Sequence, residues 1–335
     1  MSELGVDDKD RIGADERPRI AGPGMFRRAA KASWKPLAIT FVLFAALYYP
    51  VGMLLVHKID DNLDYRTEPQ GMQTGQSYAV ATVADLIDRE VRENAWTPND
   101  PWFYPSAGLD NMPNFQLGMV EALSRFGVEL LDQIGRVRGS SGADPDLQDA
   151  AGRLKISGEK WTWNPSVSIW PATPAESEYR EAARRLRSYN QRLGEGNAVF
   201  ERRVDNLQVT IERIAADLGS ASQAIDDHVR EHSGGWWFDF QVDDEFYRIK
   251  GKSYAYYLIL RDLGLDFEAV LAERNMTRTW NEMLAVMRTL AGMDPLVVLN
   301  GSPDGLIFPS HLTSQGFYLL RARTKLKEIS NILLK

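Results

Sequence analysis

Residues 200–225, FERRVDNLQVTIERIAADLGSASQAI, carry apolar side chains at alternating steps of four and three residues. This spacing aligns the apolar side chains along one face of an α-helix for more than three heptads. The positions are Phe200, Val204, Leu207, Ile211, Ile214, Leu218, Ala221 and Ile225. The stretch therefore predicts a long amphipathic helix whose apolar face must be covered by another helix.

A second stripe of this kind lies directly upstream, in residues 179–193, and the turn residues Gly-Glu-Gly-Asn at 194–197 separate the two. Two amphipathic helices joined by a short loop typically form an antiparallel hairpin. We expect residues 174–232 to form such a helical hairpin within the chain. We refer to the apolar face from Phe200 to Ile225 as the seam. Pairing of the seam between two chains, in a homo-oligomer, is the alternative.

Helical spacing recurs elsewhere, so the fold class is expected to be mainly α, a helical bundle. Leu312, Leu319, Leu326 and Leu333 recur every seven residues and indicate a buried bundle face rather than a zipper. Residues 238–249 instead alternate apolar and polar side chains around Asp243-Asp244-Glu245, which predicts at most one small β-hairpin. The further helices are expected at residues 78–94, capped by Ser77, and at 115–139, 253–263, 266–275, 279–292 and from Ser310 onward.

Residues 37–56, LAITFVLFAALYYPVGMLLV, are twenty positions without a charge. At 1.5 Å per residue they span about 30 Å, the thickness of the hydrocarbon layer of a bilayer. Six Lys or Arg residues lie between positions 17 and 35, whereas only Lys58 and Arg66 follow closely. Because the more basic flank stays inside, we expect a single transmembrane helix with a cytoplasmic N-terminus.

This topology divides the chain into four parts. Residues 1–36 are expected to be a largely disordered cytoplasmic tail, and residues 57–76 a polar linker. Residues 77–335 are then a periplasmic helical domain held at the bacterial inner membrane.

Charge and composition exclude several classes of function. Residues 1–36 hold eight Lys or Arg against six acids, which leaves the rest of the chain with a net charge of about −9. Such a body repels phosphate backbones, so we expect no nucleic-acid binding. The chain has no cysteine, which excludes disulfides, thiolate zinc sites and a cysteine nucleophile.

One motif is compatible with metal chemistry. His228-Val229-Arg230-Glu231-His232 fits the H-x-x-E-H pattern, in which two histidines bind zinc and the glutamate activates water. However, His228 and His232 also continue the seam of the preceding helix. We therefore expect no metal, cofactor or catalytic residue, and keep a zinc-dependent hydrolase using His228, His232 and Glu231 as the alternative.

Tryptophans cluster in two loops outside the apolar segment. Trp161 and Trp163 stand in a Pro-rich stretch, and Trp236 and Trp237 follow the H-x-x-E-H motif. Aromatic side chains of this kind either fill gaps between helices or contact a partner. These four are the candidates for partner binding.

The chain resembles a family of bacterial inner-membrane proteins catalogued as domain of unknown function 2333. The resemblance covers residues 34–335 and is carried by PLAITFVLFAALYYPVGMLLVHKIDDN, WTPNDPWFYPSAGLDNMPNFQLG, DDEFYRIKGKSYAYYLIL and NGSPDGLIFPSHLTSQGFYLLRAR. It implies a bacterial host and no catalytic residues. We expect a structural or interaction protein of the cell envelope, with the bilayer and other envelope proteins as partners.

Overall fold

The computed structural model describes residues 23–67, 72–134, 142–163, 170–232, 240–295 and 311–334, and side chains within these except at 23–34, 228–232 and 240–241. The described residues form helices and no strand, which confirms the mainly α fold. The α-helices are α1 (Pro23–Val56), α2 (Tyr78–Asp88), α3 (Asn111–Glu129), α4 (Pro145–Leu154), α5 (Ala175–Gly194), α6 (Val204–His232), α7 (Phe240–Asp266), α8 (Glu268–Glu273), α9 (Thr277–Ala291) and α10 (His311–Leu333). Short π-helical or 3-10 segments are η1 (Arg89–Glu93), η2 (Pro105–Gly108) and η3 (Leu130–Ile134).

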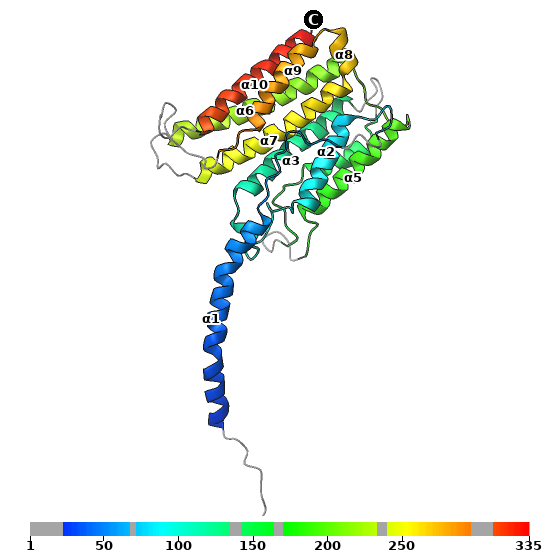
Figure 1. Cartoon of the computed structure of the whole chain (residues 1–335). Helices are drawn as coiled ribbons and strands as arrows, with labels where there is room; N and C mark the ends of the chain where they lie inside the picture. Colours follow the sequence, from blue (N-terminus) through cyan, green and yellow to red (C-terminus); the bar gives the residue numbers. More distant parts are fainter. Residues whose placement is uncertain are drawn as a thin grey trace, which may run out of the picture. The chain divides into compact units, whose positions relative to one another are not determined.

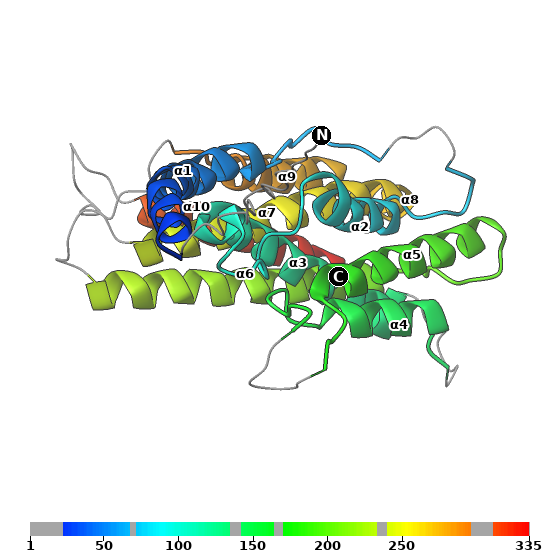
Figure 2. The same cartoon turned by 90° about the horizontal axis from the view of Figure 1, so that it is seen from below.

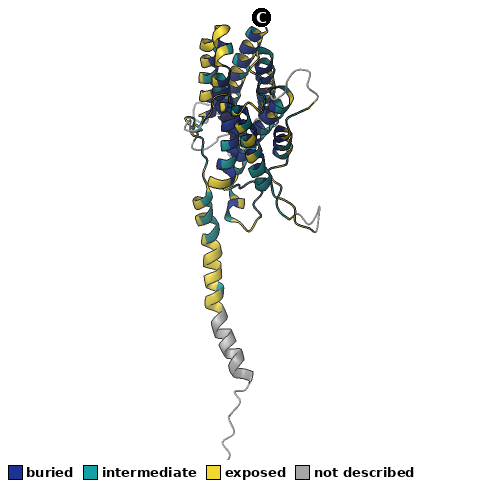
Figure 3. Cartoon of the chain, turned by 90° about the vertical axis from the view of Figure 1, so that its right-hand side faces the viewer, coloured by how far each residue is buried: buried dark blue, intermediate teal, exposed yellow. Residues whose placement is uncertain are grey.

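The chain divides into two units within α1, after Tyr48. In the first unit, the large apolar side chains from Leu37 to Leu47 are exposed, as Figure 3 shows by colour. Among the described residues, one helical segment, Lys35–Val56, is long and apolar enough to cross a membrane. The second unit, from Tyr49 onward, contains the hydrophobic core, and its residues from 57 onward are called the body below.

Helix α7 is the centre of the body, in contact with α3 on one side, α9 on another and α2 on a third (Figure 1). Its contact with α3 depends on two glycines. A Cβ atom on Gly118 would collide with the carbonyl oxygen of Arg248, and one on Gly251 would collide with the carbonyl oxygen of Phe115. The two backbones therefore approach more closely than any larger residue would allow.

Helix α2 begins at a cap shared between distant parts of the chain. The Ser77 hydroxyl accepts a hydrogen bond from the Val80 amide, which confirms the predicted N-cap. The same hydroxyl donates to Asp266 at the end of α7 (2.6 Å), and this carboxylate also accepts from the Tyr78 and Ala79 amides. One buried acid thus satisfies two unpaired N–H groups of α2 and fixes the end of α7 against its start.

The predicted hairpin of residues 174–232 is wrong. Helix α5 packs on α2 and α4, whereas α6 packs on α10 (Figures 1 and 2). The pairing of α6 with α10 is antiparallel: Ile225 lies at Gly316, and the Ser330 hydroxyl donates to Glu212 (2.8 Å) near the other end. The seam does pair within the chain, but with the leucine stripe of α10, whose Leu312, Leu319, Leu326 and Leu333 are buried as expected. The apolar stripe of α5 and that of α10 have the same spacing, so the sequence alone does not show which of them covers the seam.

The predicted β-hairpin is also wrong where the structure describes it, because residues from Phe240 onward belong to α7. Val242, Phe246 and Ile249 are buried, at steps of four and three, and this helical spacing lies within the apparent alternation. The expected helix at 253–263 is the second half of α7. No element was predicted for residues 144–154. They contain α4, with Asp144 as its N-cap and Pro145 at its first position.

Residues 57–67, the described start of the expected linker, are bound to the body. Buried Lys250 of α7 forms an ion pair with Asp61 (2.7 Å) and a second with Asp294 (2.7 Å). Arg89 donates to the Asp60 carbonyl (2.8 Å) and Arg261 to the Tyr65 carbonyl (2.6 Å). We refer to residues 57–67 as the strap, because its backbone and carboxylates compensate cations that are otherwise buried.

The glycine contact predicts a strong position dependence for the same substitution. We expect Gly118→Ala or Gly251→Ala to destabilise the folded chain by at least about 3 kcal/mol, because the backbones must separate. Gly152→Ala in α4 is the matched control, since nothing lies within 4 Å of its added Cβ, and it should gain about 0.5–1 kcal/mol. Denaturant unfolding of the full chain in detergent measures all three. Equal stability of the three variants would contradict the close approach.

Candidate functional site

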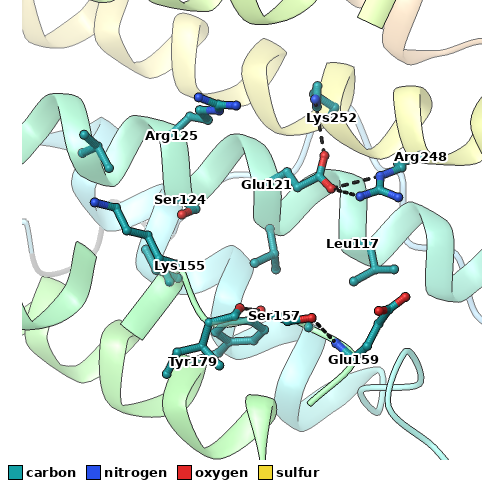
Figure 4. A pocket seen from close by; sticks show the side chains of 15 residues that line it. Leu117, Glu121, Ser124, Arg125, Lys155, Ser157, Glu159, Tyr179, Arg248 and Lys252 are labelled. Carbon is teal, nitrogen blue, oxygen red and sulfur yellow. Dashed lines mark hydrogen bonds and ion pairs between the residues drawn. The ribbon is translucent and has the colours of Figure 1, made fainter. Parts of the chain in front are cut away.

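The candidate site is a charged groove between α3, α7 and the turn that follows α4. Two adjoining cavities form the groove, one of about 470 Å³ and one of about 430 Å³. Arg125, Val128 and Lys155 line both cavities, so the two lie side by side. Figure 4 shows the first cavity with the side chains that surround it.

Helix α3 provides the central acid of the first cavity. Glu121 accepts a hydrogen bond from Nε of Arg248 (2.9 Å) and forms an ion pair with Lys252 (3.3 Å), both from α7 (Figure 4). Arg248 and Lys252 are four residues apart and therefore lie on the same face of their helix. Across the cavity, Lys155 and Glu159 are exposed, so charged side chains stand on both sides.

The second cavity contains a more deeply buried acid, Asp217 of α6. It accepts a hydrogen bond from the Tyr256 hydroxyl (2.8 Å) and forms ion pairs with Lys252 (3.3 Å) and Arg125 (3.4 Å). Burial raises the pKa of Tyr256 well above its usual value, and the neighbouring Asp217 raises it further. Tyr256 therefore keeps its proton and remains a donor. Lys252 lies between Glu121 and Asp217 and connects the two cavities.

This arrangement is suited to recognition. Cations and donors on neighbouring helices hold Glu121 and Asp217 in fixed positions. Ser124 and Ser157 add hydroxyl groups to the lining of the first cavity. A groove with alternating fixed charges can align the polar and charged side chains of a bound segment.

A second group of acids lies where α3 and α7 begin. Asp110 caps α3 through the Asn111 amide (2.9 Å), and Asn114 donates to Asp244 (2.7 Å). Burial raises the pKa of Asp243 to about 6, and the charges of Asp110 and Asp244 contribute in the same direction. Asp243, expected in a hairpin turn, instead lies in the first turn of α7, where the helix dipole favours negative charge.

The residues of the H-x-x-E-H motif are only partly described. His228, Glu231 and His232 lie in the last turns of α6, but their side chains are outside the described residues. Trp236 and Trp237 are outside them entirely. Within the described part of the chain, no group of three or more His, Asp or Glu side chains could hold a metal ion. Both the expected absence of a metal and the alternative zinc site thus stay predictions.

The two other candidate tryptophans, Trp161 and Trp163, lie in the described part of the chain. Trp161 contacts Phe103 edge to face, with ring centroids 6.1 Å apart, and Trp163 is half exposed. Trp96 differs, because it is buried and donates to the Gly158 carbonyl (2.9 Å). Sequence reasoning did not single out Glu121, Asp217 or Lys252, since nothing in their spacing indicates that α3, α6 and α7 meet.

The comparisons with known proteins give one family. Its model, described as "uncharacterized protein conserved in bacteria (DUF2333)", matches residues 58–235 and 226–335. The chain belongs to this family. Neither the curated proteins nor the solved structures contain a match to it. The resemblance to DUF2333 is therefore confirmed, and both cavities of the groove lie within the matched residues.

The acids at the start of α3 and α7 predict a pH-dependent stability. Because the pKa of Asp243 is about 6 when folded and lower when unfolded, its contribution to stability is complete below about pH 4 and is lost as the pH rises through 6. We expect Asp243→Asn to stabilise the chain by about 1 kcal/mol at pH 8 and to have little effect at pH 4.

Unfolding of the full chain in detergent, measured from pH 4 to 8, tests this expectation. Asp64→Asn is the control, because Arg288 lowers the pKa of this exposed acid through a hydrogen bond and its charge. That variant should give no gain at pH 8. A gain from Asp243→Asn that is the same at both pH values would contradict the assignment.

Proposed function

We propose that this DUF2333 chain is a membrane-anchored structural or interaction protein of the bacterial cell envelope. Residues 37–56 hold it in the inner membrane, the N-terminus is cytoplasmic and the body is periplasmic. The observation that carries the proposal is the apolar helix Lys35–Val56, most of whose large apolar side chains are exposed.

The exposure of this helix supports a lipid environment. Leu37, Phe41 and Phe44 each leave more than 60% of their surface uncovered. Each such side chain gains roughly 1.5–3 kcal/mol when it is removed from water. An apolar surface of this length is rare on a protein in water, whereas a bilayer covers it completely. The basic residues before the helix favour a cytoplasmic N-terminus.

The charged groove supports an interaction role for the body. It joins side chains of three helices into one concave surface, and its acids are neutralised in a way that suits recognition rather than catalysis. Another envelope protein that offers a polar, charged segment is the proposed partner, with a second copy of the chain as the alternative. The acidic body argues against nucleic acid. No observation favours the zinc-dependent hydrolase as a second candidate.

Membrane integration is tested by placing charge in the middle of the apolar segment. We expect Leu43→Arg with Phe44→Arg to release the chain from the membrane fraction, because each arginine costs about 2.5–3.5 kcal/mol at the centre of a spanning helix. Phe317→Arg is the matched control, since Phe317 is 61% exposed on α10 of the body. Resistance to carbonate extraction is the measurement.

Retention of the control and loss of the double variant support the anchor. Extraction of the unmodified chain by carbonate would contradict it. Because the chain has no cysteine, single cysteines in the N-terminal tail and in the body can report the side of the membrane by labelling with an impermeant maleimide.

The interaction role is tested by site-specific photo-crosslinking in intact cells. A photoreactive residue at Ser124, inside the groove, should capture a defined partner, whereas one at Arg278, 91% exposed on α9, should not. Lys155→Glu should weaken the capture at Ser124, because it reverses a charge of the groove. Capture that is equal at both positions, or unaffected by Lys155→Glu, would contradict recognition by the groove.

A further inference from the structure

The last turns of α1 are held by the segment 101–108 of the body. The Tyr49 hydroxyl donates to the Trp102 carbonyl (2.8 Å). Pro105 lies so close to Gly52 that a Cβ atom there would collide with its ring, and the Met53 methyl group lies equally close to Gly108. Three contacts along one face of α1 thus hold this segment at the level of residues 49–53 of the helix.

The segment presents aromatic side chains outward. Trp102 is 79% exposed, Phe103 45% and Tyr104 47%, and their rings contact one another in sequence. We refer to Trp102, Phe103 and Tyr104 as the aromatic collar. Residues 101–109, PWFYPSAGL, carry no charge, although the body around them is rich in charged residues.

We infer that the aromatic collar is a second membrane contact, which inserts into the lipid headgroup region beside the end of α1. This inference rests on the proposed function, because it requires residues 37–56 to span the bilayer. The occupant of the collar surface is therefore the phospholipid interface itself, and neither a partner protein nor a second copy of the chain.

The position of the collar on α1 carries the inference. Tyr49 and Met53 belong to the apolar segment, and Tyr49 is seven residues before its end at Val56. Seven residues of helix correspond to about 10 Å along the axis. A segment hydrogen-bonded to Tyr49 thus lies below the end of the spanning helix, where it meets the outer part of the bilayer, from the headgroups into the adjoining hydrocarbon.

The chemistry of the collar fits that level. Tryptophan and tyrosine are enriched at membrane interfaces, since their rings are apolar and their N–H or O–H groups reach water. Asp100, the nearest acid before the collar, is occupied by a hydrogen bond from the Ser106 hydroxyl. Residues 101–109 themselves bring no carboxylate toward the anionic headgroups.

Site-directed spin labelling of the full chain tests the inference. The chain has no cysteine, so Trp102→Cys, Leu47→Cys and Phe317→Cys each accept one label. Leu47 is the reference for lipid and Phe317 the reference for water. In liposomes of phosphatidylethanolamine and phosphatidylglycerol, collisions with oxygen and with a water-soluble nickel chelate report the depth of each label.

We expect the label at position 102 to collide with the nickel chelate at least about threefold less often than the label at 317, because it lies in the interface. Tyr104→Cys provides a second position, should Trp102→Cys fail to fold. Equal nickel collisions at 102 and 317, with 47 in lipid, would overturn the collar and leave the anchor intact.

Two other results are distinguishable. A label at 47 that is exposed to the chelate overturns the proposed function and the collar together. Dipolar broadening between labels at 102 shows that a second copy covers the collar, and overturns the lipid contact alone.

Discussion

The close approach of α3 and α7 is the constraint on which the body depends. At Gly118 and Gly251 each backbone lies against the other without a side chain between them. This proximity makes α7 a helix that is surrounded by protein, with α2 and α9 on its other sides. Most of α7 is therefore buried, and charged side chains on its buried faces need partners inside the structure.

Lys250 shows the consequence. It precedes Gly251 in α7, is fully buried, and its ammonium group is compensated by Asp61 of the strap and by Asp294. An unpaired buried charge would cost several kcal/mol, so the strap is part of the fold and not a flexible linker. Since the strap follows α1 directly, the burial of one lysine ties the end of the apolar helix to the centre of the body.

Much of this fold could be predicted from local spacing, because a buried face requires apolar residues at helical intervals whatever covers it. The seam of α6, the leucines of α10 and the cap at Ser77 are examples. The partner of each face could not be predicted, since α5 and α10 offer similar stripes. The β-hairpin around Asp243 was wrongly predicted for a related reason. A short apolar run fits both the two-residue period of a strand and the 3.6-residue period of a helix, and only the burial of Phe246 and Ile249 in the core shows that the segment is helical.

The groove was not predictable, because it is formed by the same contact between α3 and α7. Glu121 is three residues after Gly118, while Arg248 and Lys252 flank Gly251. When the glycines bring the two backbones together, the acid of one helix and the cations of the other must meet at the rim of the contact. Their charges are then fixed by helices that cannot separate without loss of the core. The charge pattern of the rim is therefore already ordered, and the partner that we propose would bind it without the entropic cost of arranging these side chains.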